Sequence, residues 1–215
     1  MNVVTFWFDP ISPYAYLAFE RLPQVLEGVS HEVVYRPVLL GALLQHHGTK
    51  GPAEVEAKRQ WTFRQVHWLA AQSGIAMCTP RSHPFNPLSL LRLALAAGDE
   101  GACNRRVADA LFGHVWRGRE GDDALDPARL AALEQQIAPA REPGSDTVKA
   151  ELRGNTEQAI AQGVFGVPSF TVNGRIFFGL DSLPMVRAAL LGDAWFDGPA
   201  WDREGAPRPG LRRNA

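Results

Sequence analysis

The stretch Val3-Val4-Thr5-Phe6-Trp7-Phe8-Asp9-Pro10-Ile11-Ser12-Pro13-Tyr14-Ala15-Tyr16 decides how the beginning of this chain folds. Residues 3–8 are β-branched or aromatic, which is the composition of a buried strand, and Asp9-Pro10 ends that run. Ser12 is a favoured N-cap and proline suits the first helical position, so a helix is predicted to start at Pro13. Ser12 then stands at the positive end of a helix, a position that suits an anion such as a thiolate.

A second landmark lies late in the chain, in Gly163-Val164-Phe165-Gly166-Val167-Pro168-Ser169-Phe170-Thr171-Val172-Asn173-Gly174. Asn173-Gly174 predicts a tight hairpin turn between strands at 169–172 and 175–178. A strand–helix unit at the start and this hairpin near the end are the layout of a thioredoxin-like fold. In that fold the proline before the hairpin is cis and faces the helix N-terminus. We therefore expect the Val167–Pro168 bond to be cis and to contact the Ser12 loop.

Helical patterns fill the middle of the chain. Residues 40–138 are predicted to form about four consecutive helices, and further helices are predicted over 145–162 and 183–191. In the long helix over 54–73, the expected apolar face contains Trp61, Val66, Trp68, Leu69 and the small alanines. The predicted class is α/β, with a thioredoxin-like domain formed by residues 1–39 and 145–195. An all-helical domain is inserted at 40–144, and an extended tail follows at 196–215.

Composition narrows the class of partner. Hydrophobic residues make up 46% of the chain, charged residues 21%, and the formal net charge is −1, so nothing favours nucleic acid or an anionic membrane. No apolar run is long enough to span a bilayer, and no signal-peptide pattern is visible. Cys78 and Cys103 are too few for a disulfide scaffold, and His46 and His47 lack partners at metal-ligand spacing. We expect a cytoplasmic protein without a metal site.

The chain resembles the 2-hydroxychromene-2-carboxylate isomerase family, thioredoxin-like proteins related to the kappa-class glutathione transferases. The resemblance covers about residues 1–195. It rests on Trp7-Phe8-Asp9 with Ser12-Pro13-Tyr14-Ala15-Tyr16, on Arg36-Pro37-Val38-Leu39-Leu40-Gly41, on His83-Pro84-Phe85-Asn86, on residues 163–170 and on Phe178-Gly179-Leu180-Asp181. Ser12 and Ala15 stand where thiol–disulfide oxidoreductases carry Cys-x-x-Cys, so dithiol exchange is not expected.

The resemblance implies a glutathione site in which Ser12 is the catalytic group, donating a hydrogen bond to the thiolate of the bound peptide. Val167 would pair with the backbone of the peptide, Asp181 would accept from its γ-glutamyl ammonium, and Lys58 would meet its glycine carboxylate. The residues that would hold glutathione are Val167, Pro168, Asp181, Ser182 and Lys58. Asp181 and Ser182 have an alternative role as an N-cap of the last helix, and Lys58 an alternative as a solvated side chain.

The second substrate implied by the resemblance is a small aromatic electrophile, for which Asn86, Tyr14 and Trp7 are the candidate binding residues. Asn86 has an alternative role as a turn residue bonded to its own backbone. An enzyme would need an apolar cavity, expected to be lined by Trp7, Tyr14, Trp61 and Phe85.

The implied reaction is the glutathione-dependent interconversion of 2-hydroxychromene-2-carboxylate and trans-o-hydroxybenzylidenepyruvate-type compounds in aromatic degradation. Two alternatives remain at this point. One is a kappa-type glutathione transferase or peroxidase acting on other electrophiles. The other is a non-catalytic thioredoxin-like module that binds a peptide or partner at the cis-proline edge. The resemblance leaves a homodimer open.

Overall fold

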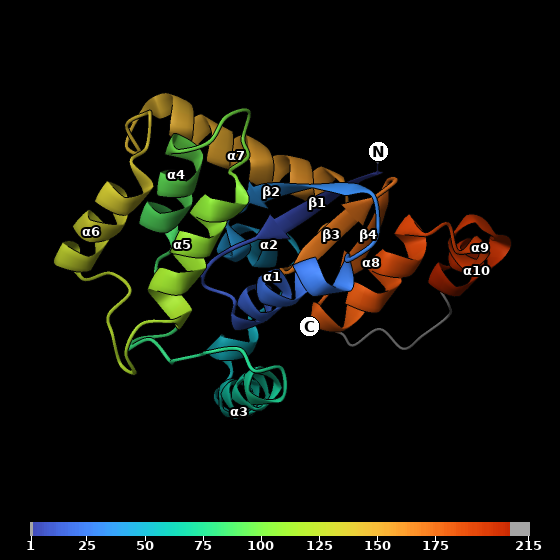
Figure 1. The fold of residues 1–215 in the computed structure, drawn as a ribbon, viewed down its shortest axis with the longest axis horizontal. Helices are drawn as coiled ribbons and strands as arrows, with labels where there is room; N and C mark the ends of the chain where they lie inside the picture. Colours follow the sequence, from blue (N-terminus) through green and yellow to red (C-terminus); the bar gives the residue numbers. More distant parts are fainter. Residues whose placement is uncertain (1, 207–215) are drawn as a thin grey trace.

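The structure is a computed structural model, and it describes residues 2–206 of the 215-residue chain (Figure 1). Four strands form one mixed sheet in the order β2-β1-β3-β4: β1 at Asn2–Phe8, β2 at His31–Pro37, β3 at Ser169–Val172 and β4 at Arg175–Phe178. β1 pairs in parallel with β2 and antiparallel with β3. β3 and β4 form the predicted hairpin, whose turn residues Asn173 and Gly174 both have positive φ.

Alternate residues of β1 point to opposite faces of the sheet. Phe6 and Phe8 are buried in the core that also contains side chains of α1 (Pro13–Val25) and α8 (Leu183–Leu190). Trp7 packs on the opposite face, against side chains of α2 (Leu40–His46) and α7 (Asp146–Ala161). Both faces are therefore covered (Figure 1), which explains why the strand is apolar on both sides.

The chain between β2 and α7 is helical, as predicted. After α2 come a short 3₁₀ turn, η1 (Pro52–Glu54), and the helices α3 (Glu56–Gln72), α4 (Leu88–Ala96), α5 (Arg105–Trp116) and α6 (Pro127–Ile137). One hydrophobic cluster joins residues of β1, α1, α4, α5 and α6. The Phe112 ring of α5, for example, lies 5.4 Å from that of Phe8 and 5.0 Å from that of Phe19. The core is continuous from the sheet into the helices, and the domain boundaries at 40 and 144 stay a prediction.

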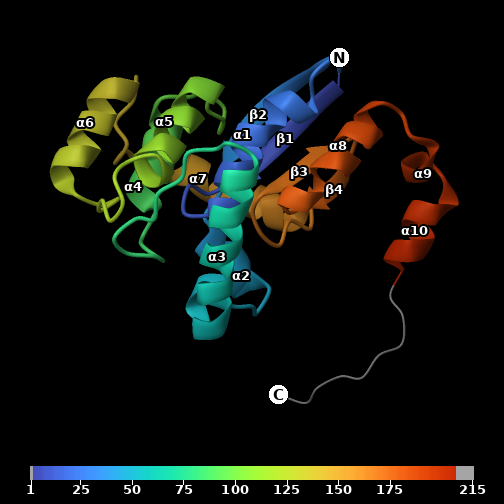
Figure 2. The ribbon, with the colours of Figure 1, turned by 60° about the horizontal axis from the view of Figure 1, so that its bottom comes forward.

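The outer helix α3 differs from its expected packing. Figure 2 shows it in front of α1 and α2 and apart from α4, α5 and α6. Its buried residues, Thr62, Val66 and Ala70, recur every four positions and form one narrow stripe. Trp61 and Trp68 lie off that stripe and are 62% and 61% exposed, so the expected apolar face with both tryptophans is wrong. The helix buries its small and β-branched residues and leaves these two tryptophans exposed, a difference that the spacing of apolar residues in the sequence did not predict.

The C-terminal segment also corrects the prediction. Residues 194–205 form two short helices, α9 (Ala194–Asp197) and α10 (Pro199–Gly205). The rings of Phe196 and Trp201 lie 5.5 and 5.6 Å from that of Phe177 on β4. The extended tail predicted from residue 196 is therefore wrong as far as residue 205, because these aromatic residues find a partner on the sheet. Residues 207–215 lie outside the described part of the chain.

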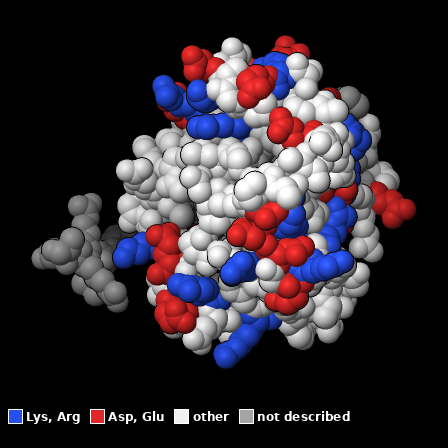
Figure 3. Space-filling view, turned by 90° about the vertical axis from the view of Figure 1, so that its left-hand side faces the viewer, with Lys and Arg blue, Asp and Glu red and all other residues white. Residues whose placement is uncertain are grey.

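Within residues 2–206, none of the helices combines the length and the apolar character needed to cross a bilayer. Figure 3 shows acidic and basic side chains mixed over the end of the molecule that carries α6. This distribution agrees with a formal net charge of −1.

Candidate functional site

The site begins where β1 turns into α1. Ser12 is buried and caps the helix, because its Oγ accepts a hydrogen bond from the Ala15 backbone N–H at 3.2 Å. The same hydroxyl donates to the Val167 carbonyl at 3.4 Å, and the Val167–Pro168 peptide bond is cis. The expected cis bond and its contact with Ser12 are thereby confirmed. A donor–acceptor distance of 3.4 Å marks a weak bond, so the Ser12 hydroxyl can turn toward a ligand.

Two backbone donors beside Ser12 are unpaired. Within residues 2–206, the N–H groups of Val167 and Tyr14 have no hydrogen-bond partner. The Tyr14 N–H belongs to the first turn of α1, where the helix dipole adds positive potential. Ser12 therefore stands among donors that favour a bound anion.

A cavity of about 1010 Å³ opens on this site. Its walls come from α1 and the turn before it, from α2 and the loop after it, and from α3. The loop at 83–87, the cis-proline loop and the turn η2 (Leu180–Ser182) complete them. The structure gathers several of the predicted site residues in this lining: Ser12, Tyr14, Val167, Pro168 and Asp181, together with Phe85.

Two of the predicted substrate residues lie elsewhere. Trp7 is 1% exposed, its indole N–H donates to the Thr171 hydroxyl at 2.8 Å, and it does not line the cavity. The alternation of β1 sends Trp7 to the α7 side of the sheet, so its expected place in the cavity is wrong. Asn86 is exposed and accepts from the backbone N–H of Leu88 at 3.1 Å, which is the alternative role of a turn residue. Asn86 is also outside the lining, as is Trp61.

Two of the predicted glutathione residues are also outside the lining. The Ser182 hydroxyl donates to the Gly179 carbonyl at 2.8 Å and is buried by that contact. Among the described residues, no side chain makes a capping hydrogen bond at the start of α8. The alternative role of Asp181 and Ser182 as an N-cap is therefore not supported. Lys58 is exposed, one helical turn before Thr62 on the same face of α3. Its contact with a glycine carboxylate stays a prediction.

Tyr14 connects α1 to α3 across the cavity. Its hydroxyl donates to Oε1 of Gln65 at 2.6 Å. Burial raises the pKa of Tyr14, the nearby Thr62 side chain partly offsets this, and the charge of Asp181 raises the pKa further. The phenol therefore keeps its proton at neutral pH and remains a hydrogen-bond donor.

Asp9 was not predicted as a site residue, although it belongs to the Trp7-Phe8-Asp9 motif of the resemblance, because Asp9-Pro10 also marks the end of a strand. Its side chain is fully buried and belongs to the cavity lining. Oδ1 accepts from the backbone N–H of Ile11 at 3.1 Å, and Oδ2 accepts from that of Leu40 at 3.0 Å. Burial raises the pKa of the Asp9 carboxyl to about 7. Because α2 has no side-chain cap of its own, Asp9 ties the start of α2 to the Ser12 turn.

Two further side chains hold the same turn from outside. His83 lies 2.8 Å from the Ile11 carbonyl through Nε2, which must carry the proton because a carbonyl only accepts. Trp116 of α5 donates its indole N–H to the Pro10 carbonyl at 2.8 Å. Residues 10–12 are therefore fixed by groups that come from three separate parts of the chain.

Three charged side chains of the lining are unpaired. Among the described residues, Arg21, Lys50 and Asp181 form no ion pair and no side-chain hydrogen bond. Of the two other carboxylates in the lining, Asp9 accepts from the backbone N–H groups of Ile11 and Leu40, and Glu54 accepts from the Gly51 N–H at 2.7 Å. Neither Arg21 nor Lys50 was predicted from the sequence as a site residue. The one available signal was that Arg21 follows Tyr14 by seven positions, which places both on one helix face.

Neither cysteine belongs to the cavity lining, and both are free thiols. Burial raises the pKa of the Cys103 thiol to about 12, so this group keeps its proton at neutral pH.

Two curated relatives match most of the chain. Rat glutathione S-transferase kappa 1 is 26% identical over 212 residues, covering 90% of this chain and 92% of that protein. The 2-hydroxychromene-2-carboxylate isomerase of Sphingobium xenophagum is 26% identical over 197 residues, covering 88% of this chain and 98% of the isomerase. These matches confirm the resemblance seen in the sequence.

Solved structures show the same architecture. A structure of 2-hydroxychromene-2-carboxylate isomerase superimposes with a TM-score of 0.75 at 21% identity, covering 91% of this chain and 97% of the other. The cytosolic disulfide reductase DsbM from Pseudomonas aeruginosa gives a TM-score of 0.56 at 16% identity, covering 88% and 96%. Residues 3–191 match the family described as DSBA-like thioredoxin domain. With the thioredoxin-like fold confirmed and most of its length matched, this chain belongs to the DSBA-like thioredoxin domain family.

Proposed function

We propose that this protein is an enzyme that binds glutathione and uses its thiolate to isomerise or conjugate an aromatic electrophile. The observation that carries the proposal is the Ser12 hydroxyl at the N-terminus of α1, beside the unpaired Val167 N–H and in one cavity with the unpaired Asp181. Relatives named as kappa-class glutathione transferases and as 2-hydroxychromene-2-carboxylate isomerases support it.

The residues present fit the charges of glutathione. The backbone of Val167 offers a free N–H to an extended peptide, in the manner of an added strand. The unpaired Asp181 suits the γ-glutamyl ammonium, and the unpaired Lys50 suits the glycine carboxylate. Lys58, one turn outside the lining, is the second candidate for that carboxylate.

Bound glutathione would supply the sulfur, which bonds to one carbon of the electrophile's double bond while the π pair moves to the conjugated carbonyl oxygen. The former double bond is then a single bond and can rotate. After rotation the electron pair returns, the double bond re-forms and the carbon–sulfur bond breaks. The protein's own part is to hold the sulfur as an anion, through the Ser12 hydroxyl and the Tyr14 N–H. Ala15 offers no second thiol for dithiol exchange. We therefore propose binding without redox cycling.

Of the substrates, we propose the pair 2-hydroxychromene-2-carboxylate and a trans-o-hydroxybenzylidenepyruvate, as in the degradation of aromatic compounds. Leu40, Leu69 and Phe85 give the cavity an apolar wall for an aromatic ring, which favours an enzyme over a non-catalytic binding module. Transfer of glutathione to other electrophiles is the second candidate. The deciding test incubates purified protein and glutathione with chromene carboxylates and with aryl halides and follows absorbance. A cytoplasmic location and a homodimer stay predictions.

Asp181→Ala is expected to weaken glutathione binding. A charge-assisted hydrogen bond to an ammonium contributes about 1.5–3 kcal/mol, so the dissociation constant should rise roughly ten- to a hundredfold. Isothermal titration calorimetry measures this directly. Asp202→Ala is the matched control, because Asp202 is an exposed carboxylate on α10 outside the cavity. An unchanged dissociation constant in a folded Asp181→Ala protein would remove Asp181 from the site.

Ser12→Ala is expected to raise the pKa of the bound thiol by about one unit, since one hydrogen bond to a charged group corresponds to about that shift. Turnover near neutral pH should fall by about tenfold or more, with glutathione affinity little changed. Thiolate absorbance against pH and the isomerase rate measure both effects.

The control for Ser12→Ala is Ser145→Ala. Ser145 caps α7 by accepting from the Val148 N–H at 3.4 Å, and it lies outside the cavity lining. Ser145→Ala therefore removes a helix cap comparable to that of Ser12 without touching the site. If Ser12→Ala lowers stability as Ser145→Ala does but leaves titration and rate unchanged, Ser12 is an N-cap only.

A further inference from the structure

Arg21 stands out among the cavity residues as a cation with no internal role. Its side chain is half-buried, lines the cavity, and forms no ion pair or hydrogen bond with any of residues 2–206. Removing a guanidinium partly from water without a partner is unfavourable. An unpaired cation in this position therefore calls for an anionic ligand.

The position of Arg21 relates it to Asp181. Arg21 lies two turns after Tyr14 on the same face of α1, a rise of about 10 Å. Side chains of a helix lean toward its N-terminus, so the long Arg21 side chain can reach toward Tyr14. The helix packs against η2, which carries Asp181, and the charge of Asp181 is felt at the Tyr14 phenol. Arg21 and Asp181 therefore line one cavity from two elements that pack against each other.

These two opposite charges are not paired with each other. An unpaired carboxylate and an unpaired guanidinium on two packed elements of one cavity are complementary to a zwitterion placed between them. The sequence resemblance also assigns Ser182 to the glutathione site, but the Ser182 hydroxyl donates to the Gly179 carbonyl and lies outside the lining. Arg21 is the available group on that side.

We propose that Arg21 and Asp181 together recognise the α-amino acid end of the γ-glutamyl group, with Arg21 binding its carboxylate and Asp181 its ammonium. The inference rests on the proposed function, since it names how the same cavity selects its thiol. It makes the protein selective for thiol peptides that carry an α-amino acid group at the γ-glutamyl position. Lys50, also in the lining, remains for the glycine carboxylate.

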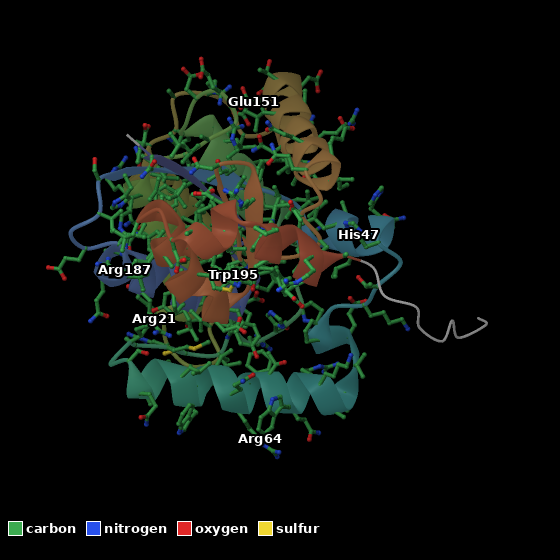
Figure 4. All side chains as sticks on the ribbon, turned by 90° about the vertical axis from the view of Figure 1, so that its right-hand side faces the viewer. Arg21, His47, Arg64, Glu151, Arg187 and Trp195 are labelled. Carbon is green, nitrogen blue, oxygen red and sulfur yellow. The ribbon has the colours of Figure 1, made fainter. Side chains whose placement is uncertain are left out.

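The experiment compares three thiol peptides by calorimetry, without any electrophile. They are glutathione, 4-aminobutanoyl-cysteinyl-glycine, which lacks the α-carboxylate, and glutaryl-cysteinyl-glycine, which lacks the ammonium. The variants are Arg21→Met, which keeps the apolar stem, and Asp181→Asn. The matched control is Arg64→Met, because Figure 4 shows Arg64 on the outer side of α3, pointing away from the body, whereas Arg21 lies between α3 and the body.

Arg21→Met should raise the dissociation constant of glutathione by roughly ten- to thirtyfold and leave that of the 4-aminobutanoyl peptide nearly unchanged. Asp181→Asn should likewise raise the dissociation constant of glutathione and leave that of the glutaryl peptide nearly unchanged. Arg64→Met should bind all three peptides as the wild type does. Arg21→Lys should recover part of the glutathione affinity, because it keeps the charge but loses the guanidinium fork.

Equal losses of affinity for glutathione and the 4-aminobutanoyl peptide in Arg21→Met, or no loss for either, would overturn the inference. A second measurement tests whether Arg21 binds the carboxylate of the electrophile instead. It compares rates on benzylidenepyruvate, which carries a carboxylate, and on benzylideneacetone, which does not. If Arg21→Met lowers only the benzylidenepyruvate rate and leaves glutathione affinity intact, Arg21 belongs to the electrophile and the inference is wrong. If wild-type protein binds no glutathione, the proposed function itself fails.

Discussion

Between about pH 4 and pH 8, Asp9 alone is expected to lower the free energy of unfolding by about 4 kcal/mol. The carboxyl is fully buried, and burial raises its pKa from 3.8 in the unfolded chain to about 7 in the folded protein. Between these two values the native state holds a proton that the unfolded state has lost. The contribution of Asp9 to stability is therefore complete below pH 3.8 and is lost as the pH rises through about 7.

The measurement is urea unfolding of the wild type and of Asp9→Asn at several pH values across this range. Asparagine cannot titrate, so the wild type should lose stability with rising pH relative to the variant. The variant loses one of the two acceptors for the Ile11 and Leu40 N–H groups, which lowers its stability at every pH without changing the slope. His83, whose pKa burial lowers, destabilises the fold as the pH falls below 6.5, and it does so equally in both proteins. Parallel pH profiles for the two proteins would contradict the raised pKa of Asp9.

This result bears on the site because Asp9 ties the Ser12 turn to α2. Asp9 is a carboxyl that costs stability when it ionises, and it lies in the lining of the cavity. Residues of this kind are found preferentially at functional sites. The charge state of Asp9 also acts on any thiolate held by the same turn, since two nearby negative charges repel.

Trp116→Ala is expected to lower the free energy of unfolding by about 3–5 kcal/mol, the range for a buried aromatic residue replaced by alanine. Trp116 is fully buried, and its ring lies 6.5 Å from that of Tyr16 and 5.7 Å from that of His83. The indole N–H also donates to the Pro10 carbonyl, which would be left buried without this donor. Urea denaturation with circular dichroism measures the loss.

Two further variants separate packing from the hydrogen bond. Trp68→Ala removes a tryptophan that is 61% exposed on α3, and it should leave stability within about 0.5 kcal/mol of the wild type. Trp116→Phe keeps most of the ring and removes only the bond to Pro10, so it should cost about 1–3 kcal/mol and loosen the Ser12 turn. If Trp116→Ala were no less stable than Trp68→Ala, the shared core between α1 and α5 would be refuted.

Sequence by itself determined the parts of this protein whose chemistry is local. The strand at β1, the Ser12 cap with Pro13 behind it, and the Asn173-Gly174 hairpin each follow from a few adjacent residues with strong backbone preferences. The order of these landmarks along the chain was enough to indicate the thioredoxin-like fold and the facing of Ser12 and Val167.

Only the tertiary structure decided which side chains reach the cavity. Trp7 and Tyr14 looked alike as aromatic candidates, but one faces α7 and the other faces α3. Asp9 and Arg21 were not predicted as site residues, because their surroundings come from segments distant in sequence: α2 supplies the Leu40 N–H that Asp9 accepts from, and none of residues 2–206 supplies an ion-pair partner for Arg21. A short-range pattern fixes the conformation of a backbone segment, whereas the role of a side chain depends on the elements that pack against it.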